Sequence, residues 1–174
     1  MTPLVSELAD RAEITSLVSR YFSAIDDKRL DRTTMEAVFT ASCRLTRTNG
    51  ASLVGPEAIA AGQSESFARF RATHHVSCDH VIDLDGDSAR LRANLIAMHL
   101  WADQERDPNT LQTHFLAGGV LHALVVRTGR GWRLSELSLR NTWRTGSGYA
   151  AILATELATV QYVHLPVLRH SQQA

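Results

Sequence analysis

The period of the hydrophobic pattern changes once along this chain of 174 residues, and that change constrains the fold more than any other feature. Before Phe70, apolar residues recur at steps of three and four, which is typical of helices. After Phe70 they alternate, most clearly from Ala89 to Trp101. The order predicts an α+β domain in which N-terminal helices cover one face of a curved antiparallel sheet. Such a cone-shaped sheet would enclose an apolar pocket.

The helical half contains three predicted helices. The first begins near Ser6 and ends at Ile25, and its apolar stripe consists of Ile14, Leu17, Val18, Tyr21, Phe22 and Ile25. A shorter helix is expected over 31–39 with Asp31 as its cap, and a third over 56–69 with Pro56 in its first turn. A strand over 42–48 and a turn at Asn49-Gly50 separate them.

Four long strands are predicted after the change of period, over 73–84, 89–101, 113–127 and 132–143. Asp85-Gly86-Asp87 and Thr128 to Gly131 are predicted hairpin turns, and Asp107-Pro108-Asn109 interrupts the pattern. Ala117-Gly118-Gly119 suits sharp curvature of the sheet or close approach of a ligand. Residues 1–145 therefore form one domain, and 146–174 are expected to be a linker and a tail with a possible helix over 149–160.

Composition excludes several classes of protein. Eighteen basic and eighteen acidic residues balance, so no overall field favours nucleic acid or an anionic membrane. Neither a signal peptide nor an apolar run long enough to span a membrane is recognisable, which predicts a cytoplasmic protein. Cys43 and Cys78 are expected to be free thiols.

Histidines and one carboxylate are the candidates for chemistry. His99 lies on the apolar face of its predicted strand, where a buried imidazole needs a partner or must stay neutral. Asp26 borders the apolar stripe at the end of the first helix, where the helix dipole does not favour a carboxylate. His74 and His75 lie on opposite faces of the next strand, and alternation does not show which of them faces the core. A carboxylate that orients a histidine makes a general base that works near neutral pH.

Other kinds of site lack their sequence signatures. His-x-His, His-x-x-x-His and Cys-x-x-Cys spacings are absent, as are a Gly-x-Ser-x-Gly elbow and a phosphate-binding glycine loop. The sequence therefore predicts neither a metal site nor a cofactor.

Four segments together resemble the nuclear transport factor 2-like superfamily, in its SnoaL-like and scytalone dehydratase-like branch. They are Ala24 to Arg32, Thr73 to Ser77, Asp85 to Ala89 and Gly131 to Leu134, within a match over about residues 7–145. The resemblance implies a cone-shaped α+β fold. It places the catalytic aspartate of the dehydratase on Asp26, its paired histidine on His75 and its second histidine on His99.

The implied activity is that of a cofactor-independent dehydratase or cyclase acting on a polyketide- or terpenoid-like molecule. His75, held by Asp26, would remove a proton beside a carbonyl, while His99 would polarise the carbonyl or protonate the departing hydroxyl. The chain departs from the dehydratase at Ile25, Gly119 and Leu121, where the relative carries polar side chains, so we expect a more apolar pocket and a bulkier or less hydroxylated substrate. The predicted binding residues are Tyr21, Phe22, Leu95, Ala97, Trp101, Gly119 and Leu121.

Two alternatives stay open at this point. Relatives include proteins that bind hydrophobic ligands without turnover and small subunits of dioxygenases, which a separation of Asp26 from His75 would favour. An epoxide hydrolase would need a second carboxylate, for which Glu136 is the nearest candidate. We also expect a homodimer or larger homo-oligomer through the outer sheet face, with Leu137, Leu139 and Trp143 as a possible surface.

Overall fold

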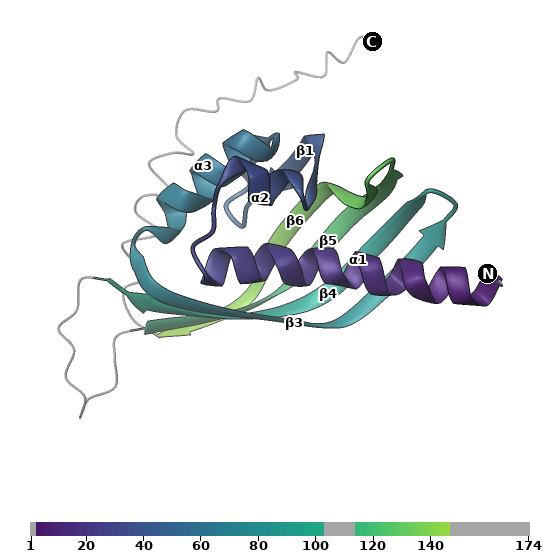
Figure 1. Ribbon diagram of the computed structural model, residues 1–174. Helices are drawn as coiled ribbons and strands as arrows, with labels where there is room; N and C mark the ends of the chain where they lie inside the picture. Colours follow the sequence, from purple (N-terminus) through teal and green to yellow (C-terminus); the bar gives the residue numbers. More distant parts are fainter. Residues whose placement is uncertain (1–2, 103–113, 147–174) are drawn as a thin grey trace, which may run out of the picture.

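Among the described residues, 3–102 and 114–146, six strands form one curved sheet and three helices cover one of its faces, in a computed structural model of the chain (Figure 1). The strand order is β2-β1-β6-β5-β4-β3. Neighbouring strands are antiparallel, except that β1 pairs with β6 in parallel. This arrangement confirms the predicted α+β cone, in which the sheet stays open.

The helices follow the predicted pattern. α1 spans Pro3–Asp26, and all six residues of its predicted stripe are buried. α2 spans Arg32–Glu36, and the Oδ1 atom of its cap Asp31 accepts a hydrogen bond from the backbone N of Thr34 at 2.8 Å. It is shorter than predicted because the chain enters β1 at Phe39. α3 spans Pro56–Phe67, with proline in its first turn.

The strands agree with the predicted ranges to within a few residues at each end, and β1 begins and ends earlier than its predicted range, 42–48. Their bounds are β1 Phe39–Thr46, β2 Ser52–Val54, β3 Phe70–Asp85, β4 Ser88–Trp101, β5 His114–Thr128 and β6 Gly131–Gly146. The sequence pattern did not predict β2, which has only three residues. The predicted interruption at 107–109 and the predicted helix over 149–160 lie outside the described residues.

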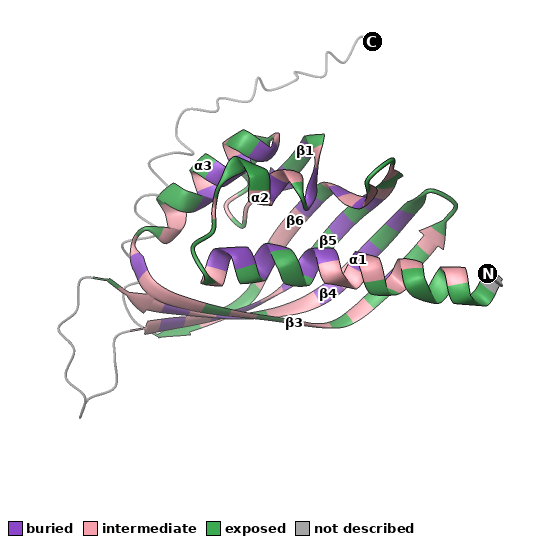
Figure 2. Ribbon diagram, in the orientation of Figure 1, coloured by how far each residue is buried: buried purple, intermediate pink, exposed green. Residues whose placement is uncertain are grey.

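The main core lies between α1 and the covered face of the sheet, where buried residues gather in Figure 2. Trp132 is fully buried, and its indole Nε1 donates to Asp10 Oδ1 at 3.0 Å. The backbone N of Trp132 donates to Glu13 Oε1 at 2.9 Å. These bonds join the first half of α1 to β6. A second, smaller cluster of buried residues contains Phe70 and Phe115.

A bulge in β3 explains why alternation could not choose between His74 and His75. The pairing of β3 with β4 shifts between Cys78 and Val81, and Asp79 adopts a positive φ of 53°. The bulge inserts one residue, so the covered face passes from odd-numbered to even-numbered positions. His75 therefore faces the same side as Ile82, whereas His74 is exposed on the outer face.

A second bulge, in β6, changes which residues share a face. Gly118 pairs with Trp143, and Gly119 pairs with Asn141, so one residue of β6 is left over. The indole of Trp143 occupies the position where a Cβ of Gly118 would lie, and a Cβ on Gly119 would stand 2.6 Å from the carbonyl oxygen of Arg140. Close approach by the neighbouring strand thus requires both glycines.

This second bulge contradicts the grouping of Leu137, Leu139 and Trp143 on one surface. Leu137 is buried in the core, and Leu139 lines a cavity on the covered face. Trp143 alone of the three is exposed. Glu136 is exposed as well and lies away from that cavity, which removes the carboxylate considered for an epoxide hydrolase.

Candidate active site

The C-terminal end of α1 places Asp26 beside the start of β3. Lys28 adopts a positive φ of 56°, and the backbone N of Arg29 donates to the carbonyl of Ala24 at 2.8 Å. This is the Schellman pattern, which ends a helix sharply. The Nζ atom of Lys28 then donates to the carbonyl of Phe70 at 2.7 Å and ties the helix end to β3.

Asp26 accepts three hydrogen bonds from β3. His75 Nδ1 lies 2.6 Å from Asp26 Oδ1, the backbone N of His75 donates to Oδ2 at 2.9 Å, and the Thr73 hydroxyl donates to Oδ1 at 2.7 Å. Thr73 and His75 reach the same carboxylate because residues two apart in a strand share a face. The His75 side chain is only 4% exposed and that of Asp26 is 18% exposed. The carboxylate therefore fixes both the position of the imidazole and the tautomer that leaves Nε2 available.

Electrostatics keep this carboxylate ionised. Burial raises the pKa of Asp26, but the hydrogen bonds from the His75 side chain and backbone, the charge of His75 and the bond from Thr73 outweigh burial, and the pKa is lowered. An ionised Asp26 accepts a hydrogen bond from the Nδ1–H group of His75. It also stabilises the imidazolium that forms when Nε2 takes a second proton.

His99 faces the same space from β4. Its ring centroid lies 5.4 Å from that of His75, and it stacks on Phe115 at 4.1 Å with an interplanar angle of 7°. Burial, and next the charge of His75, lower the pKa of His99 to about 3. Its Nδ1 atom is buried and has no hydrogen-bond partner among the described residues. His99 is therefore a neutral imidazole at ordinary pH, which can polarise a ligand group but is too weak a base to serve as the main proton acceptor.

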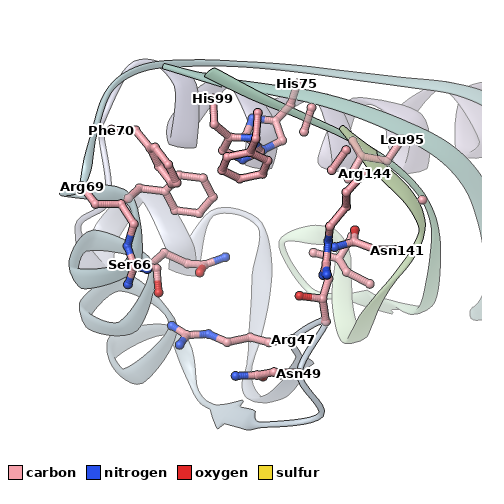
Figure 3. Close-up of a pocket in the computed structure, with 18 of the residues that line it drawn as sticks. Arg47, Asn49, Ser66, Arg69, Phe70, His75, Leu95, His99, Asn141 and Arg144 are labelled. Carbon is pink, nitrogen blue, oxygen red and sulfur yellow. The ribbon is translucent and has the colours of Figure 1, made fainter. Parts of the chain in front are cut away.

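A cavity of about 380 Å³ opens in front of the two histidines, which is within the range of small-molecule sites. Aromatic rings surround the histidine end, namely Phe67, Phe70 and Phe115. Figure 3 shows Arg47 and Asn49 on the opposite wall, Ser66 and Arg69 on one side, and Asn141 and Arg144 on the other. The predicted apolar pocket is therefore apolar only at its histidine end.

The predicted site residues fall into two groups. His75, His99, Leu95, Ala97 and Gly119 line the cavity, and Asp26 lies directly behind His75. The prediction is wrong for the other four binding residues, which do not line the cavity: Tyr21, Phe22, Trp101 and Leu121. These residues support the cavity wall from behind.

Each supporting residue has a definite contact. Phe22 stacks on His75 with the ring centroids 5.1 Å apart, and Trp101 packs on Phe70 at 4.9 Å. The hydroxyl of Tyr21 accepts a short hydrogen bond from Nε2 of Gln63, and Leu121 is fully buried in the main core.

The sequence pattern did not predict the polar residues of the cavity wall, nor the aromatic residues Phe67, Phe70 and Phe115 at its histidine end. Phe115 could have been found, because it alternates with Ala117 and Gly119 on the covered face of β5. Arg144 could not, because only the bulge in β6 turns it to the pocket side beside Ala117. The amide oxygen of Asn141, in the orientation that satisfies its neighbours, accepts from Arg144 Nε at 2.7 Å.

Within residues 3–102 and 114–146, no three His, Cys, Asp or Glu side chains cluster in a way that could hold a metal ion. Both cysteines are free thiols. The same part of the chain has no helix of sufficient length and apolar character to cross a bilayer.

Comparison with known proteins identifies the family. The model of the SnoaL-like domain matches residues 6–138, which is most of the chain. The chain belongs to the SnoaL-like family. This confirms the resemblance to the nuclear transport factor 2-like superfamily. No curated protein sequence matches the chain significantly.

Solved structures share the fold. The Kfla4162 protein from Kribbella flavida is 29% identical over 80% of this chain and 95% of its own, with a TM-score of 0.70. A Novosphingobium aromaticivorans protein assigned as a scytalone dehydratase is 20% identical over 83% and 91%, with a TM-score of 0.69. The hexachlorocyclohexane dehydrochlorinase LinA-type3 from Novosphingobium barchaimii is 16% identical over 83% and 94%, also at 0.69.

Proposed function

We propose that this SnoaL-like protein is a cofactor-independent lyase or cyclase in which Asp26 and His75 act together as a general base. The observation that carries the proposal is the 2.6 Å contact between His75 Nδ1 and Asp26 Oδ1, inside a cavity that His75 lines. A binding protein without turnover would not need a carboxylate that orients an imidazole toward its ligand. The contact therefore favours an enzyme over the alternative of a non-catalytic partner subunit.

The reaction begins with proton transfer to His75. Nε2 takes a proton from a carbon beside a carbonyl, the C–H electron pair moves into an enolate, and Asp26 stabilises the imidazolium that results. Neutral His99 donates a hydrogen bond to the carbonyl oxygen, where negative charge develops. A ring NH does this without any change of net charge on His99, which suits its low pKa.

Elimination completes the reaction. The enolate electrons form a carbon–carbon double bond, the C–O bond to a β-hydroxyl breaks, and His75 returns its proton to the departing oxygen, so that water leaves. If the enolate carbon instead attacks an electrophilic carbon within the same molecule, a ring closes, and the confined cavity promotes this by proximity. The folds shared with a dehydrochlorinase and with an assigned dehydratase support elimination chemistry.

Cyclic polyketide- or terpenoid-like compounds are the substrate class that we propose. Phe67, Phe70 and Phe115 give a flat ring system an aromatic wall to pack on, and the volume of about 380 Å³ admits a molecule of a few fused rings.

The test uses a panel of cyclic β-hydroxyketones, with formation of the conjugated enone followed by absorbance. His75→Ala and Asp26→Asn are each expected to lower turnover by roughly 10²- to 10⁴-fold while the melting temperature shows a folded protein. His74→Ala is the matched control, because His74 is the neighbouring histidine on the outer face, and it should keep full turnover. Full activity in either dyad variant would refute the proposed base.

A further inference from the structure

The polar walls of the pocket carry more positive than negative charge. Three guanidinium groups line the cavity, those of Arg47, Arg69 and Arg144, whereas Glu65 is its one lining carboxylate among the described residues. Glu65 is also exposed to solvent, and Asp26 is engaged behind His75. The local field therefore favours a ligand that carries negative charge.

Among the described arginines, Arg47 has two buried side-chain nitrogens without a hydrogen-bond partner. Its side chain extends from the turn after β1 toward the cavity (Figure 3), where its Nε and Nη2 atoms are buried and have no hydrogen-bond partner among the described residues. Burying charged nitrogens without acceptors is costly, so such an arrangement needs a compensating interaction. Arg144, by contrast, has the amide oxygen of Asn141 as an acceptor.

The surroundings make room for the Arg47 guanidinium and hold it at the pocket. A Cβ on Gly62 of α3 would stand 2.7 Å from Arg47 Nη2, so the helix carries a glycine where the guanidinium packs. Gln63, the next residue, is buried, lines the cavity and bonds to Tyr21. The positive charge of Arg47 also acts on the buried Tyr21 hydroxyl, which shows that it lies near this pair.

We propose that Arg47 binds a carboxylate of the substrate on the wall opposite His75 and His99, so that the enzyme acts on cyclic carboxylic acids. The planar guanidinium matches a carboxylate, since it can donate two parallel hydrogen bonds to the two oxygens. In the proposed complex, rotation about the Cδ–Nε bond of Arg47 turns the rigid Nε–Nη2 edge from Gly62 toward the carboxylate in the cavity. The aromatic rings would then hold the ring system between the anchored carboxylate and the carbon that reacts at His75.

This inference rests on the proposed function only for the identity of the pocket, and a binding measurement tests it without turnover. The probes are 2-naphthoate and 2-naphthamide, which have the same shape and differ in charge, titrated calorimetrically into the unmodified protein. Naphthoate should bind roughly tenfold more tightly or better, as expected for a charge-assisted hydrogen bond. Equal affinity for the two probes would overturn the proposal.

Variants locate the effect. Arg47→Met should abolish the preference for naphthoate, and Arg47→Lys, which keeps the charge but not the paired donors, should retain part of it. Arg90→Met is the matched control, because Arg90 is exposed on β4 away from the cavity, and it should leave the preference unchanged. A preference that persists in Arg47→Met would contradict the assignment to this residue. If the methionine variant does not fold, an undiminished preference in Arg47→Lys would contradict the assignment instead.

The two proposals fail separately. His75→Ala should keep the preference for naphthoate while it loses turnover. If it keeps turnover, the proposed base is wrong and the carboxylate site stands. If turnover depends on His75 while both naphthyl probes bind equally, the base stands and the carboxylate site is wrong.

Discussion

At the histidine end of the pocket Asp26 accepts three hydrogen bonds, whereas on the opposite wall two buried nitrogens of Arg47 have no acceptor among the described residues. The first arrangement fixes a side chain in one position, and the second leaves a charged side chain to be completed by a ligand. We propose that the two ends have different roles, in which the histidine end performs proton transfer and the Arg47 wall selects the molecule. Predictions that change one end without the other test this division.

The largest effect is expected from the double variant Asp26→Asn/His75→Ala. Because the two residues act as a unit, the double variant should lose about as much turnover as the worse single variant, roughly 10²- to 10⁴-fold. Steady-state rates of the unmodified protein, the two single variants and the double variant on the same β-hydroxyketone give a double-mutant cycle. Losses that multiply would mean that Asp26 acts independently of His75.

His99 should make stability depend on pH. Its pKa is about 3 in the folded protein, below the ordinary value of about 6.5 in the unfolded chain. Between these values the unfolded state binds a proton that the folded state does not, so the unfolding free energy falls as pH decreases, by up to about 1.4 kcal/mol per pH unit. His99→Phe should flatten the curve of unfolding free energy against pH between about pH 6 and pH 4. Denaturant titration at several pH values in this range measures the curve.

The control for this measurement is His122→Gln, because His122 is exposed on the outer face, and it should leave the slope unchanged. Asp26 contributes in a lower window: its pKa is depressed in the folded state, so its stabilisation is present above the ordinary carboxyl pKa of about 3.9 and is lost as pH falls through the folded value. A slope in His99→Phe equal to that of the unmodified protein would show that His99 is not held neutral.

Thr73→Val removes one of the three hydrogen bonds to Asp26 at nearly constant volume. A hydrogen bond to a charged group contributes about 1.5–3 kcal/mol, and the unfolding free energy should fall by that order. The pKa of Asp26 should rise, and turnover should fall less than in Asp26→Asn. Thr142→Val is the comparison, since Thr142 donates to a neutral carbonyl, that of Gly118, at 3.0 Å. A larger loss of stability there than at Thr73 would contradict the charged-acceptor argument.

Gly62→Ala should have the smallest effect on stability. Alanine favours the helix by roughly 0.5–1 kcal/mol, while its Cβ displaces the flexible ends of Arg47 and Leu53, so the net change should stay within about 1 kcal/mol. The displaced guanidinium should nevertheless weaken the preference for naphthoate. Ala61→Gly, at an exposed position of the same helix, measures only the difference in helix propensity between alanine and glycine. It should not alter the preference for naphthoate. An unchanged preference in Gly62→Ala would mean that the packing of Arg47 on α3 does not matter for binding.

How far the sequence predicted the molecule depended on whether a strand kept its period. In β4 the alternation is unbroken, so His99, Leu95 and Ala97 were placed correctly by counting residues. In β3 the bulge at Asp79 reverses the phase, so counting could not separate His75 from His74, and only the family resemblance did.

Long-range packing hid the rest of the site. Arg47 follows a strand whose parallel partner, β6, lies far along the chain, so nothing local indicates that it faces His75. Tyr21 and Phe22 are apolar-stripe residues near Asp26, but the stripe points them into the layer behind the cavity wall, where Tyr21 meets Gln63 and Phe22 meets His75. Periodicity shows that a residue is buried, and tertiary contacts decide whether it faces core or cavity.

The most direct test of the proposed base is the tautomer of His75, read from the nitrogen-15 chemical shifts of labelled histidine. We expect His75 to carry its proton on Nδ1, bonded to Asp26, with Nε2 free as the base, and we expect Asp26→Asn but not His74→Ala to disturb this pattern. A neutral His75 with its proton on Nε2, or a His75 tautomer that is the same in Asp26→Asn, would refute the proposed base.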